Sequence, residues 1–337
     1  MPRVISMEGD LMESSTIETN ELTKDFINKR GIIRRESRTT RALDQVKLQI
    51  KEHEIFGLIG ESGSGKTTLG LALLKLMDVD SGQIIFNGNN IMKYTGRQLF
   101  GFREKTQMIF QDPYSSLNPV ISVYKSIVTP LRVFHKELKE EEVLNKAIET
   151  IEMVGLTPAE QFLNKFPNQL SGGQRQRIGI ARAVINNPDF IIADEPVSML
   201  DVSLRADILN ILLDLKRKFG KSMMFISHDI AVTQYVSDRI AVMHLGQLVE
   251  VAKSDRIINN PMHPYTKSLI DSIPVPDPKK KWNLDESKGQ ISEYVNEGKN
   301  ECSYANKCPF VMDNCRKERP KFREVEKDHL VACYLYE

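Results

Sequence analysis

The sequence predicts an α/β fold, in which helices pack on a buried sheet. Short apolar runs with strand character occur at 54–60 (EIFGLIG), 188–196 (PDFIIADEP) and 222–229 (SMMFISHD). Segments with helical spacing of apolar residues lie between them, and 66–77 and 203–220 are the clearest. Strands that alternate with amphipathic helices are the pattern of an α/β sheet core.

The other elements can be justified in chain order. Residues 16–26 alternate enough to form a first strand. The basic segment 27–41 is interpreted as a solvated loop or hairpin tip, with a phosphate-binding or nucleic-acid role as the alternative. Further expected elements are a strand and turn at 82–90, a charged helix at 137–155, and two strands joined by a turn at 239–252.

Composition and charge exclude several classes of protein. The net charge is +1 and the pI is about 7.6, so the overall field gives no reason to expect nucleic-acid binding. No apolar run approaches the roughly 18 residues that a membrane span needs. The N-terminal segment lacks the apolar stretch of a secretory signal. We therefore expect a cytosolic protein, in which disulfides explain the cysteines poorly.

Residues 60–68 (GESGSGKTT) match the phosphate-loop pattern G-x-x-x-x-G-K-[ST], between a buried strand and an amphipathic helix. The glycines let backbone N–H groups turn inward around phosphate oxygens, and the start of the helix adds a positive dipole. Lys66 would bridge the β- and γ-phosphates, and the Thr67 hydroxyl would ligate Mg²⁺. A glycine-rich turn that matches by chance is the alternative. The expected nucleotide contacts are Gly60, Ser62, Gly63, Ser64, Gly65, Lys66, Thr67 and Thr68.

Two adjacent acids, Asp194 and Glu195, end the buried run at 188–196. The carboxyl edge of an open α/β sheet is where ligands bind. Asp194 would hold Mg²⁺ through water, and Glu195 would orient and polarise the water that attacks the γ-phosphate. The alternative is an acid pair at the N-terminus of a helix, because Pro196 follows.

The four cysteines of the chain lie in its last segment, with the spacing C-x5-C-x6-C-x17-C. This is neither the C-x2-C pair of common zinc ribbons nor a ferredoxin run. The spacing predicts four thiolates around one metal site. A tail of about 55 residues after the proline-rich stretch 272–282 cannot bury much core, so a metal site would supply folding free energy. The proposed ligands are Cys302, Cys308, Cys315 and Cys333.

Further motifs complete a set that names a family. They are Gln111 in IFQDP, LSGGQ at 170–174, Asp201 in SMLD and His228 in SHD. In order and spacing the set resembles the ATPase subunits of ATP-binding cassette (ABC) transporters. The resemblance covers roughly 16–275. It implies an ABC-type P-loop NTPase core with a helical subdomain at about 100–170, active in hydrolysing ATP with Mg²⁺.

The resemblance also implies roles for these residues. In the family, two subunits dimerise head to tail around two ATP molecules. The LSGGQ segment would then hold, in trans, the γ-phosphate bound to the partner, and Asp201 would couple the two sites. His228 would contact the γ-phosphate on its own side, and Gln111 would touch Mg²⁺ or the attacking water. The trans contacts would be Ser171, Gly172, Gly173, Gln174 and Asp201, and the catalytic residues Glu195, His228, Lys66 and Gln111.

Two positions depart from the family pattern. Family members stack adenine on an aromatic side chain near the first strand, often Tyr, and Phe26 fits that position. A core Phe is the competing interpretation. Met199 stands where the family usually has Ala, but Asp201 is in place, so we expect a modified and still active site.

The segments 109–119 and 259–274 resemble the oligopeptide/dipeptide importer group of ABC ATPases, and 170–183 (LSGGQRQRIGIARA) resembles its F-type subunit. The resemblance implies a peripheral subunit at the cytoplasmic face of the membrane. Its partners would be a D-type ATPase, two permeases and, indirectly, an extracellular substrate-binding protein, and the isolated chain could form a homodimer. Alternative substrates are oligosaccharides or nickel. A soluble ABC ATPase of translation or DNA repair, and a regulatory binding module, are more distant alternatives.

That group also carries the pattern C-x-Y-x-x-x-C-P followed by Cys and V-A-C, as at 302–333 here. In the group this pattern resembles a [4Fe–4S] site, and zinc, free thiols or disulfides are the alternatives. We therefore expect an ATPase domain at 16–275 and, at 276–337, a C-terminal extension with a metal site made of the four cysteines.

Overall fold

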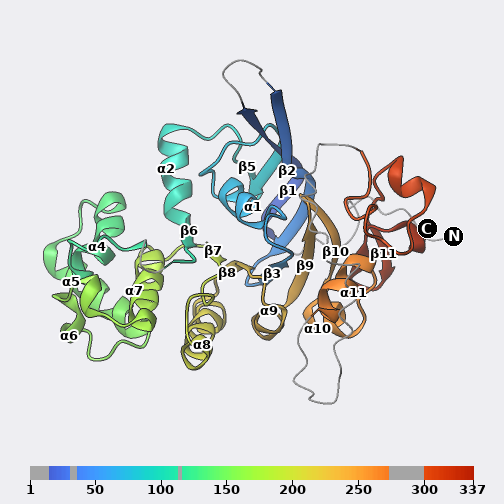
Figure 1. Cartoon of the computed structure of the whole chain (residues 1–337). Coiled ribbons are helices and arrows are strands. Elements are labelled where there is room, and N and C mark those ends of the chain that lie inside the picture. Colours follow the sequence, from blue (N-terminus) through green and yellow to red (C-terminus); the bar gives the residue numbers. More distant parts are fainter. Residues whose placement is uncertain (1–14, 31–35, 113–115, 273–299) are drawn as a thin grey trace, which may run out of the picture.

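The computed structural model describes residues 15–30, 36–112, 116–272 and 300–337. Two sheets, one of eight strands and one of four, carry the fold (Figure 1). Helices cover the larger sheet, and a separate group of helices stands to one side of it. The α/β class expected from the alternation of strands and helices is confirmed.

The larger sheet has the strand order β11-β12-β10-β9-β3-β8-β7-β6. Strands β9, β3, β8, β7 and β6 run parallel, and β10, β12 and β11 continue the sheet antiparallel. Strands β3, β7 and β8 are buried along their whole length, as is typical of parallel strands covered on both faces. The bounds are β3 (Ile55–Ile59), β6 (Thr106–Ile109), β7 (Phe190–Asp194), β8 (Ser222–Ile226), β9 (Arg239–His244), β10 (Gln247–Lys253), β11 (Arg323–Glu326) and β12 (His329–Val331).

The smaller sheet has the order β2-β1-β4-β5 and is antiparallel. Its strands are β1 (Ser15–Arg30), β2 (Glu36–Lys51), β4 (Ser81–Phe86) and β5 (Asn89–Asn90). The strand expected at 16–26 is confirmed, and it is longer because it pairs with β2 along a projecting hairpin (Figure 1). The tip of the basic segment, 31–35, lies outside the described residues.

Several helices pack on the two sheets, and α2 bridges toward the separate helical group (Figure 1). Helix α8 ends at Gly220, whose φ of 61° gives the left-handed cap that the sequence predicts. Helix α1 ends earlier than expected, because Lys75 has a φ of 51° and the N–H of Leu76 returns to the carbonyl of Leu71. The bounds are α1 (Lys66–Leu73), α2 (Gly96–Lys105), α8 (Val202–Phe219), α9 (Ile230–Val236), α10 (Ser254–Asn259) and α11 (Pro264–Asp271).

The helical group lies on the left of Figure 1 and contains the charged helix expected at 137–155. Its apolar faces share a core with β7 and α8, in which Ile127, Ile151 and Ile178 are fully buried. The amphipathic pattern of these helices thus has an ordinary explanation in packing. The elements are α4 (Val123–Phe134), α5 (Glu140–Met153), α6 (Glu160–Leu163), the 3₁₀ helix η1 (Pro167–Gln169) and α7 (Gly172–Val184).

The C-terminal tail is an extension of the larger sheet and not a free appendage. Strand β12 pairs with β10, and the buried carboxylate of Glu250 accepts a hydrogen bond of 2.7 Å from Nε2 of His329. Tyr304 and Ala305 share a core with Ile240 and Val249 of the sheet. Packing on the sheet therefore stabilises the tail. The sequence alone predicts only a metal site as the source of this stability. Its 3₁₀ helices are η3 (Asp313–Arg316) and η4 (Tyr334–Tyr336).

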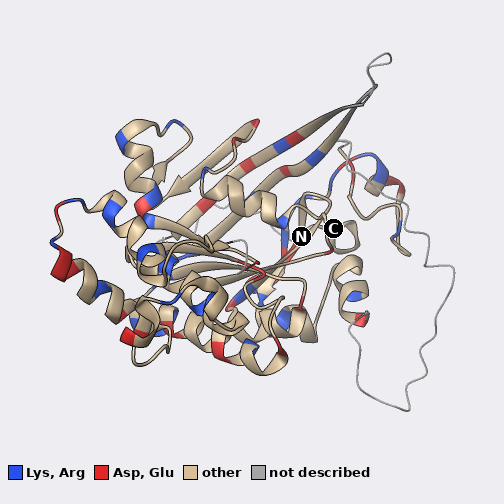
Figure 2. Ribbon diagram, turned by 60° about the vertical axis from the view of Figure 1, so that its left-hand side comes forward, with Lys and Arg blue, Asp and Glu red and all other residues tan. Residues whose placement is uncertain are grey.

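Basic residues (Lys, Arg) and acidic residues (Asp, Glu) are interspersed along the ribbon (Figure 2). None of the helices in the described ranges has the length and apolar character needed to cross a lipid bilayer.

Candidate nucleotide site

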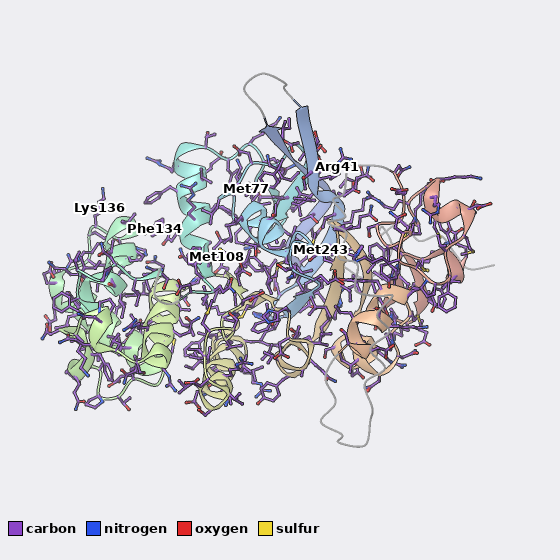
Figure 3. All side chains as sticks on the ribbon, viewed as in Figure 1. Arg41, Met77, Met108, Phe134, Lys136 and Met243 are labelled. Carbon is purple, nitrogen blue, oxygen red and sulfur yellow. The ribbon has the colours of Figure 1, made fainter. Side chains whose placement is uncertain are left out.

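The segment 60–68 consists of the loop 60–65, which joins β3 to α1, and the start of α1, and it lies at the carboxyl edge of the parallel strands. Gly65 has a φ of 106°, and a Cβ there would lie 2.3 Å from the carbonyl oxygen of Ala42. A Cβ on Gly60 would lie 2.2 Å from the carbonyl oxygen of Met243. Both glycines are therefore required for the loop to lie against β2 and β9. Met243 is labelled in Figure 3, close to this junction.

Lys66 lies inside the loop that precedes it. Its Nζ donates to the carbonyl oxygens of Gly60 at 2.8 Å and Glu61 at 2.9 Å. Burial lowers the pKa of Lys66, and the charges of Glu195 and Asp194 act in the opposite direction. The hydroxyl of Ser64 is buried and has no hydrogen-bond partner among the described residues. The loop thus offers a cation and a free hydroxyl to an anion.

The predicted magnesium ligands Thr67 and Asp194 are in contact. Asp194 is the buried last residue of β7, and burial raises the pKa of its carboxyl. A hydrogen bond from the side chain of Thr67 acts against this rise. One hydroxyl and one carboxylate therefore meet beside the phosphate loop, and both are ligand types that Mg²⁺ accepts.

Three loops bring together the predicted catalytic residues. The carboxylate of Glu195 accepts a hydrogen bond of 3.0 Å from Nε2 of Gln111 and lies 3.0 Å from Nδ1 of His228. These residues follow β7, β6 and β8, whose carboxyl ends lie side by side. Glu195 has a φ of 46°, a strained conformation for a residue other than glycine, and its N–H donates to the carbonyl of Ile226. Strain of this kind is concentrated at functional sites.

The LSGGQ segment caps helix α7. The Ser171 hydroxyl accepts from the N–H of Gln174, and the Gln174 side chain accepts in return from the N–H of Ser171. Gly172 opens the helix, and a Cβ on Gly173 would lie 3.1 Å from Leu204 of α8. Asp201 is the residue before α8. Across the described ranges, these residues form no hydrogen bond or ion pair with the loop at 60–68.

Phe26 lies on β1 opposite Thr40, and 38% of its surface is exposed. The Nζ atom of Lys24 is 5.7 Å from the centre of its ring. An exposed ring beside a cation does not suit the interpretation as a core residue. The adenine-stacking role stays a prediction.

The four cysteines come together in the tail. The N–H of Cys302 donates to the carbonyl oxygen of Cys315 at 2.9 Å. Burial raises the pKa of Cys302 to about 12, and the charges of the other three thiols add to the rise. Cys308 and Cys333 show the same pattern of burial and mutual repulsion. In the part of the chain described here, however, no group of three or more His, Cys, Asp or Glu side chains is arranged to hold a metal ion.

A pocket of about 600 Å³ separates the helical group from the sheet, and the sequence argument did not predict it. Met108 of β6 and Phe134 of α4, both labelled in Figure 3, line it. Arg103 and Arg182 also line it. Phe110, the neighbour of Gln111, lines it as well, so the pocket adjoins the segment that carries Gln111.

Sequence reasoning also missed the contacts that link the tail to the phosphate loop through α11. Tyr265 of α11 is 1% exposed, and its hydroxyl accepts a hydrogen bond of 3.1 Å from the N–H of Glu61. Its ring packs on His244 and on Tyr304 of the tail. No local sequence pattern predicts such contacts, because they join segments that are distant in sequence.

Two protein families match the chain. The family described as "ABC transporter" matches 43–198, and the family described as "Oligopeptide/dipeptide transporter, C-terminal region" matches 249–315. The Bacillus subtilis protein YkfD is 43% identical over 301 residues, which cover 89% of this chain and 91% of that protein. The oligopeptide transport ATP-binding protein OppF of Bacillus subtilis is 39% identical, with 96% of this chain and 97% of that protein covered.

Solved structures agree with these families. The dimeric ATP-binding cassette MJ0796, in a post-hydrolysis state bound to ADP and Pi, is 31% identical with a TM-score of 0.62. The match covers 71% of this chain and 98% of that chain. The cbiO1 structure from Clostridium perfringens is 24% identical with a TM-score of 0.63, covers 74% of this chain and 92% of its own, and supports the fold. The chain belongs to the ABC transporter family, in its oligopeptide/dipeptide group, and its enzymatic activity is the hydrolysis of ATP.

Proposed function

We propose that this chain is the ATP-hydrolysing subunit of an importer for di- and oligopeptides. The observation that carries the proposal is the contact of Glu195 with both Gln111 and His228 beside the phosphate loop. The names of the relatives support peptides as the cargo, because OppF and AppF of Bacillus subtilis are named oligopeptide transport ATP-binding proteins.

In the proposed site, the loop at 60–68 holds the phosphates of ATP. Lys66 exchanges its carbonyl partners in the loop for β- and γ-phosphate oxygens. Thr67 and Asp194 would hold Mg²⁺, which would offset the charge of the phosphates, and Gln111 would contact the ion or the attacking water. Phe26 stacks on the adenine.

Glu195 is the group that orients and polarises the attacking water. Its contacts with Gln111 and His228 limit the rotation of its carboxylate, so little reorganisation is needed once the water is bound. His228 is 61% exposed in its side chain, which leaves it open to the γ-phosphate.

The dimer is part of the proposal. Ser171 and Gln174 cap a helix whose N-terminus carries a positive dipole, and within the described residues they form no hydrogen bond with the phosphate loop of their own chain. In a head-to-tail dimer with a D-type subunit, this cap and Asp201 would complete the site of the partner. The dimeric relative MJ0796 supports this arrangement.

The pocket between the helical group and the sheet is where a permease would dock. An apolar floor with Met108 and Phe134 and a rim with Arg103 suit a short amphipathic helix with an acidic end. A helix bound there would press on the segment that leads to Gln111. The proposal thus places the subunit at the cytoplasmic face of the membrane, held by two permeases, with the substrate-binding protein outside.

The tail supplies four thiolates for a [4Fe–4S] cluster, with zinc as the alternative. Three of the sulfurs accept the backbone N–H of the residue two positions later, as Cys302 does from Tyr304, Cys308 from Phe310 and Cys333 from Leu335. Such bonds would stabilise thiolates, and a bound cation would offset the repulsion among the ionised sulfurs. When bound, the metal would neutralise these charges and hold the tail together. The proposed division into 16–275 and 276–337 rests on this tail.

The test is transport by the complete complex in proteoliposomes. ATP-dependent uptake of labelled tri- and pentapeptides, with maltotriose and Ni²⁺ as competing cargoes, decides the substrate class. Peptide uptake that depends on Lys66 supports the proposal. Uptake of only the sugar or the metal ion would reject peptide import and leave the ATPase in place.

A further inference from the structure

The phosphate loop is held from outside at two of its backbone positions. The N–H of Glu61 donates to the hydroxyl of Tyr265 at 3.1 Å, and the carbonyl oxygen of Ser64 accepts from the N–H of Gly246 at 2.8 Å. Tyr265 belongs to α11, and Gly246 to the turn between β9 and β10. Neither residue belongs to the motifs of the site.

The cysteine-bearing tail contacts both of these holding elements. Beside the turn, the hydroxyl of Ser303 lies 2.9 Å from Nδ1 of His244, the last residue of β9. The N–H of Ser303 donates to the side-chain oxygen of Gln247, the first residue of β10, at 3.2 Å. On α11, the ring of Tyr304 lies 5.3 Å from the ring of Tyr265, centre to centre. Two adjacent tail residues thus lie one contact away from both anchors of the loop.

The link also reaches the cysteines. The N–H of Tyr304 donates to the sulfur of Cys302. Tyr304 is 7% exposed and Tyr265 is 1% exposed, so neither ring can move without displacing its neighbours. The position of Tyr265 therefore depends on the folded state of 302–304.

We propose that Tyr265 is a positioning residue for the phosphate loop, and that the folded tail sets its position through Tyr304. The Tyr265 hydroxyl fixes the peptide between Gly60 and Glu61, whose carbonyl side faces Lys66. With that peptide fixed, the loop is ready for phosphate before nucleotide arrives. The extension then contributes to nucleotide affinity as well as to stability. This inference rests on the proposed function of 60–68 as the phosphate-binding loop.

The two tyrosines act through different atoms, and this allows a sharp test. At Tyr265 the hydroxyl matters, so Tyr265→Phe keeps the ring packing and loses the bond to Glu61. At Tyr304 the ring matters, so Tyr304→Leu loses the contact and Tyr304→Phe retains it. Tyr334→Phe is the matched control, because it removes one phenol bond, to the carbonyl of Glu318, elsewhere in the tail.

The measurements are the Kd for MgATP and the KM and kcat of ATP hydrolysis, on the purified full-length chain with its metal as isolated. Tyr265→Phe and Tyr304→Leu should each raise Kd and KM about fivefold, the size expected for one net hydrogen bond, with kcat within about twofold. Tyr304→Phe and Tyr334→Phe should match the parent. The double variant Tyr265→Phe/Tyr304→Leu should show less than the product of the two single effects.

An unchanged Kd in Tyr265→Phe, or an equal rise in Tyr334→Phe, would overturn the inference. If Tyr304→Leu does not fold, Tyr265→Phe and its control still decide the role of the hydroxyl. Lys66→Ala separates the two proposals. Unimpaired MgATP binding in Lys66→Ala would reject the loop as the phosphate site, whereas lost binding there with a normal Tyr265→Phe rejects only the positioning role.

Discussion

The imidazole of His228 lies 3.0 Å from the carboxylate of Glu195, measured from Nδ1 to Oε1. Each residue follows a different buried strand, β8 and β7, and the parallel pairing of these strands brings them together. Gln111 bonds the other oxygen of the same carboxylate. A carboxylate held on both oxygens is oriented before substrate binds.

Replacing Glu195 by Gln keeps the shape of this side chain and removes its charge. We expect ATP turnover to fall by roughly 10²–10⁴-fold, the usual range for a general base, with MgATP still bound. Single-turnover hydrolysis and equilibrium binding measure the two effects. Glu160→Gln, on the exposed start of α6, is the control and should hydrolyse ATP like the parent. Full turnover in Glu195→Gln would reject its assigned role.

Gly65→Ala should damage the phosphate loop. The new Cβ would lie 2.3 Å from the carbonyl oxygen of Ala42, at a φ of 106° that L residues rarely adopt. We expect a loss of stability of about 1–3 kcal/mol and loss of MgATP binding, measured by urea unfolding and calorimetry. The control is Gly101→Ala inside α2, where a Cβ meets nothing within 4 Å. It should be neutral or stabilising by up to about 1 kcal/mol.

The features that the sequence predicts correctly are local. The turn from strand to helix at 60–68, the buried strands and the Gly220 cap each follow from neighbouring residues. The meeting of Glu195, Gln111 and His228 could be expected only through the family resemblance, because three separate loops supply it. The early end of α1 depends on the left-handed conformation of Lys75, which the spacing of apolar residues does not predict.

The tail was the least predictable region. Strand β12 joins the sheet because Glu250 of β10 is buried with a partner, His329, that lies far along the chain. Glu250 also accepts the N–H groups of Met262 and His263. The sequence does not show that Glu250 is a buried carboxylate with three hydrogen-bond donors, because the donors come from segments that only the fold brings together. The same holds for Tyr265, which looks like an ordinary helix residue in the sequence.

The lowered pKa of His263 should make the free energy of unfolding decrease in mild acid. It is 1% exposed, burial lowers its pKa to about 4, and its Nδ1 accepts the N–H of Tyr265 at the start of α11. The neighbouring Glu250 acts in the opposite direction. The unfolded chain binds a proton near pH 6.5 and the folded chain only near 4, so this contribution is complete above pH 6.5 and is lost as pH falls toward 4.

The expected loss is about 1 kcal/mol per pH unit between pH 6.5 and 5, measured as the free energy of unfolding. His263→Asn is the matched variant, because Asn caps a helix without titrating. Its stability should change less over this interval. An identical pH dependence in the two proteins would show that other groups are responsible.

Arg103→Glu should uncouple the subunit from the permeases of the proposed importer. Arg103 is exposed and lines the pocket, outside the nucleotide site, so MgATP binding by the isolated chain should be unchanged. Assembly with the permeases, measured by co-purification, and peptide uptake should fall at least tenfold. Lys93→Glu reverses an exposed charge that does not line the pocket and should transport normally. Normal assembly of Arg103→Glu would exclude the pocket as the docking site.

The metal content of the tail is the last prediction. Protein purified without air should contain about four iron and four acid-labile sulfide per chain, as a [4Fe–4S] cluster requires.

Removing the metal should lower the unfolding temperature of the tail, because the four thiols repel one another when ionised. The folded ATPase core should stay largely intact, because it packs through Ile127, Ile151 and Ile178. Cys315→Ser should act in the same way, since it removes one of the four proposed sulfur ligands at a buried position. About one zinc without sulfide would replace the cluster by a zinc site and keep the structural role. Metal-free protein with an unchanged unfolding temperature would reject both, and packing on β10 alone would then hold the tail.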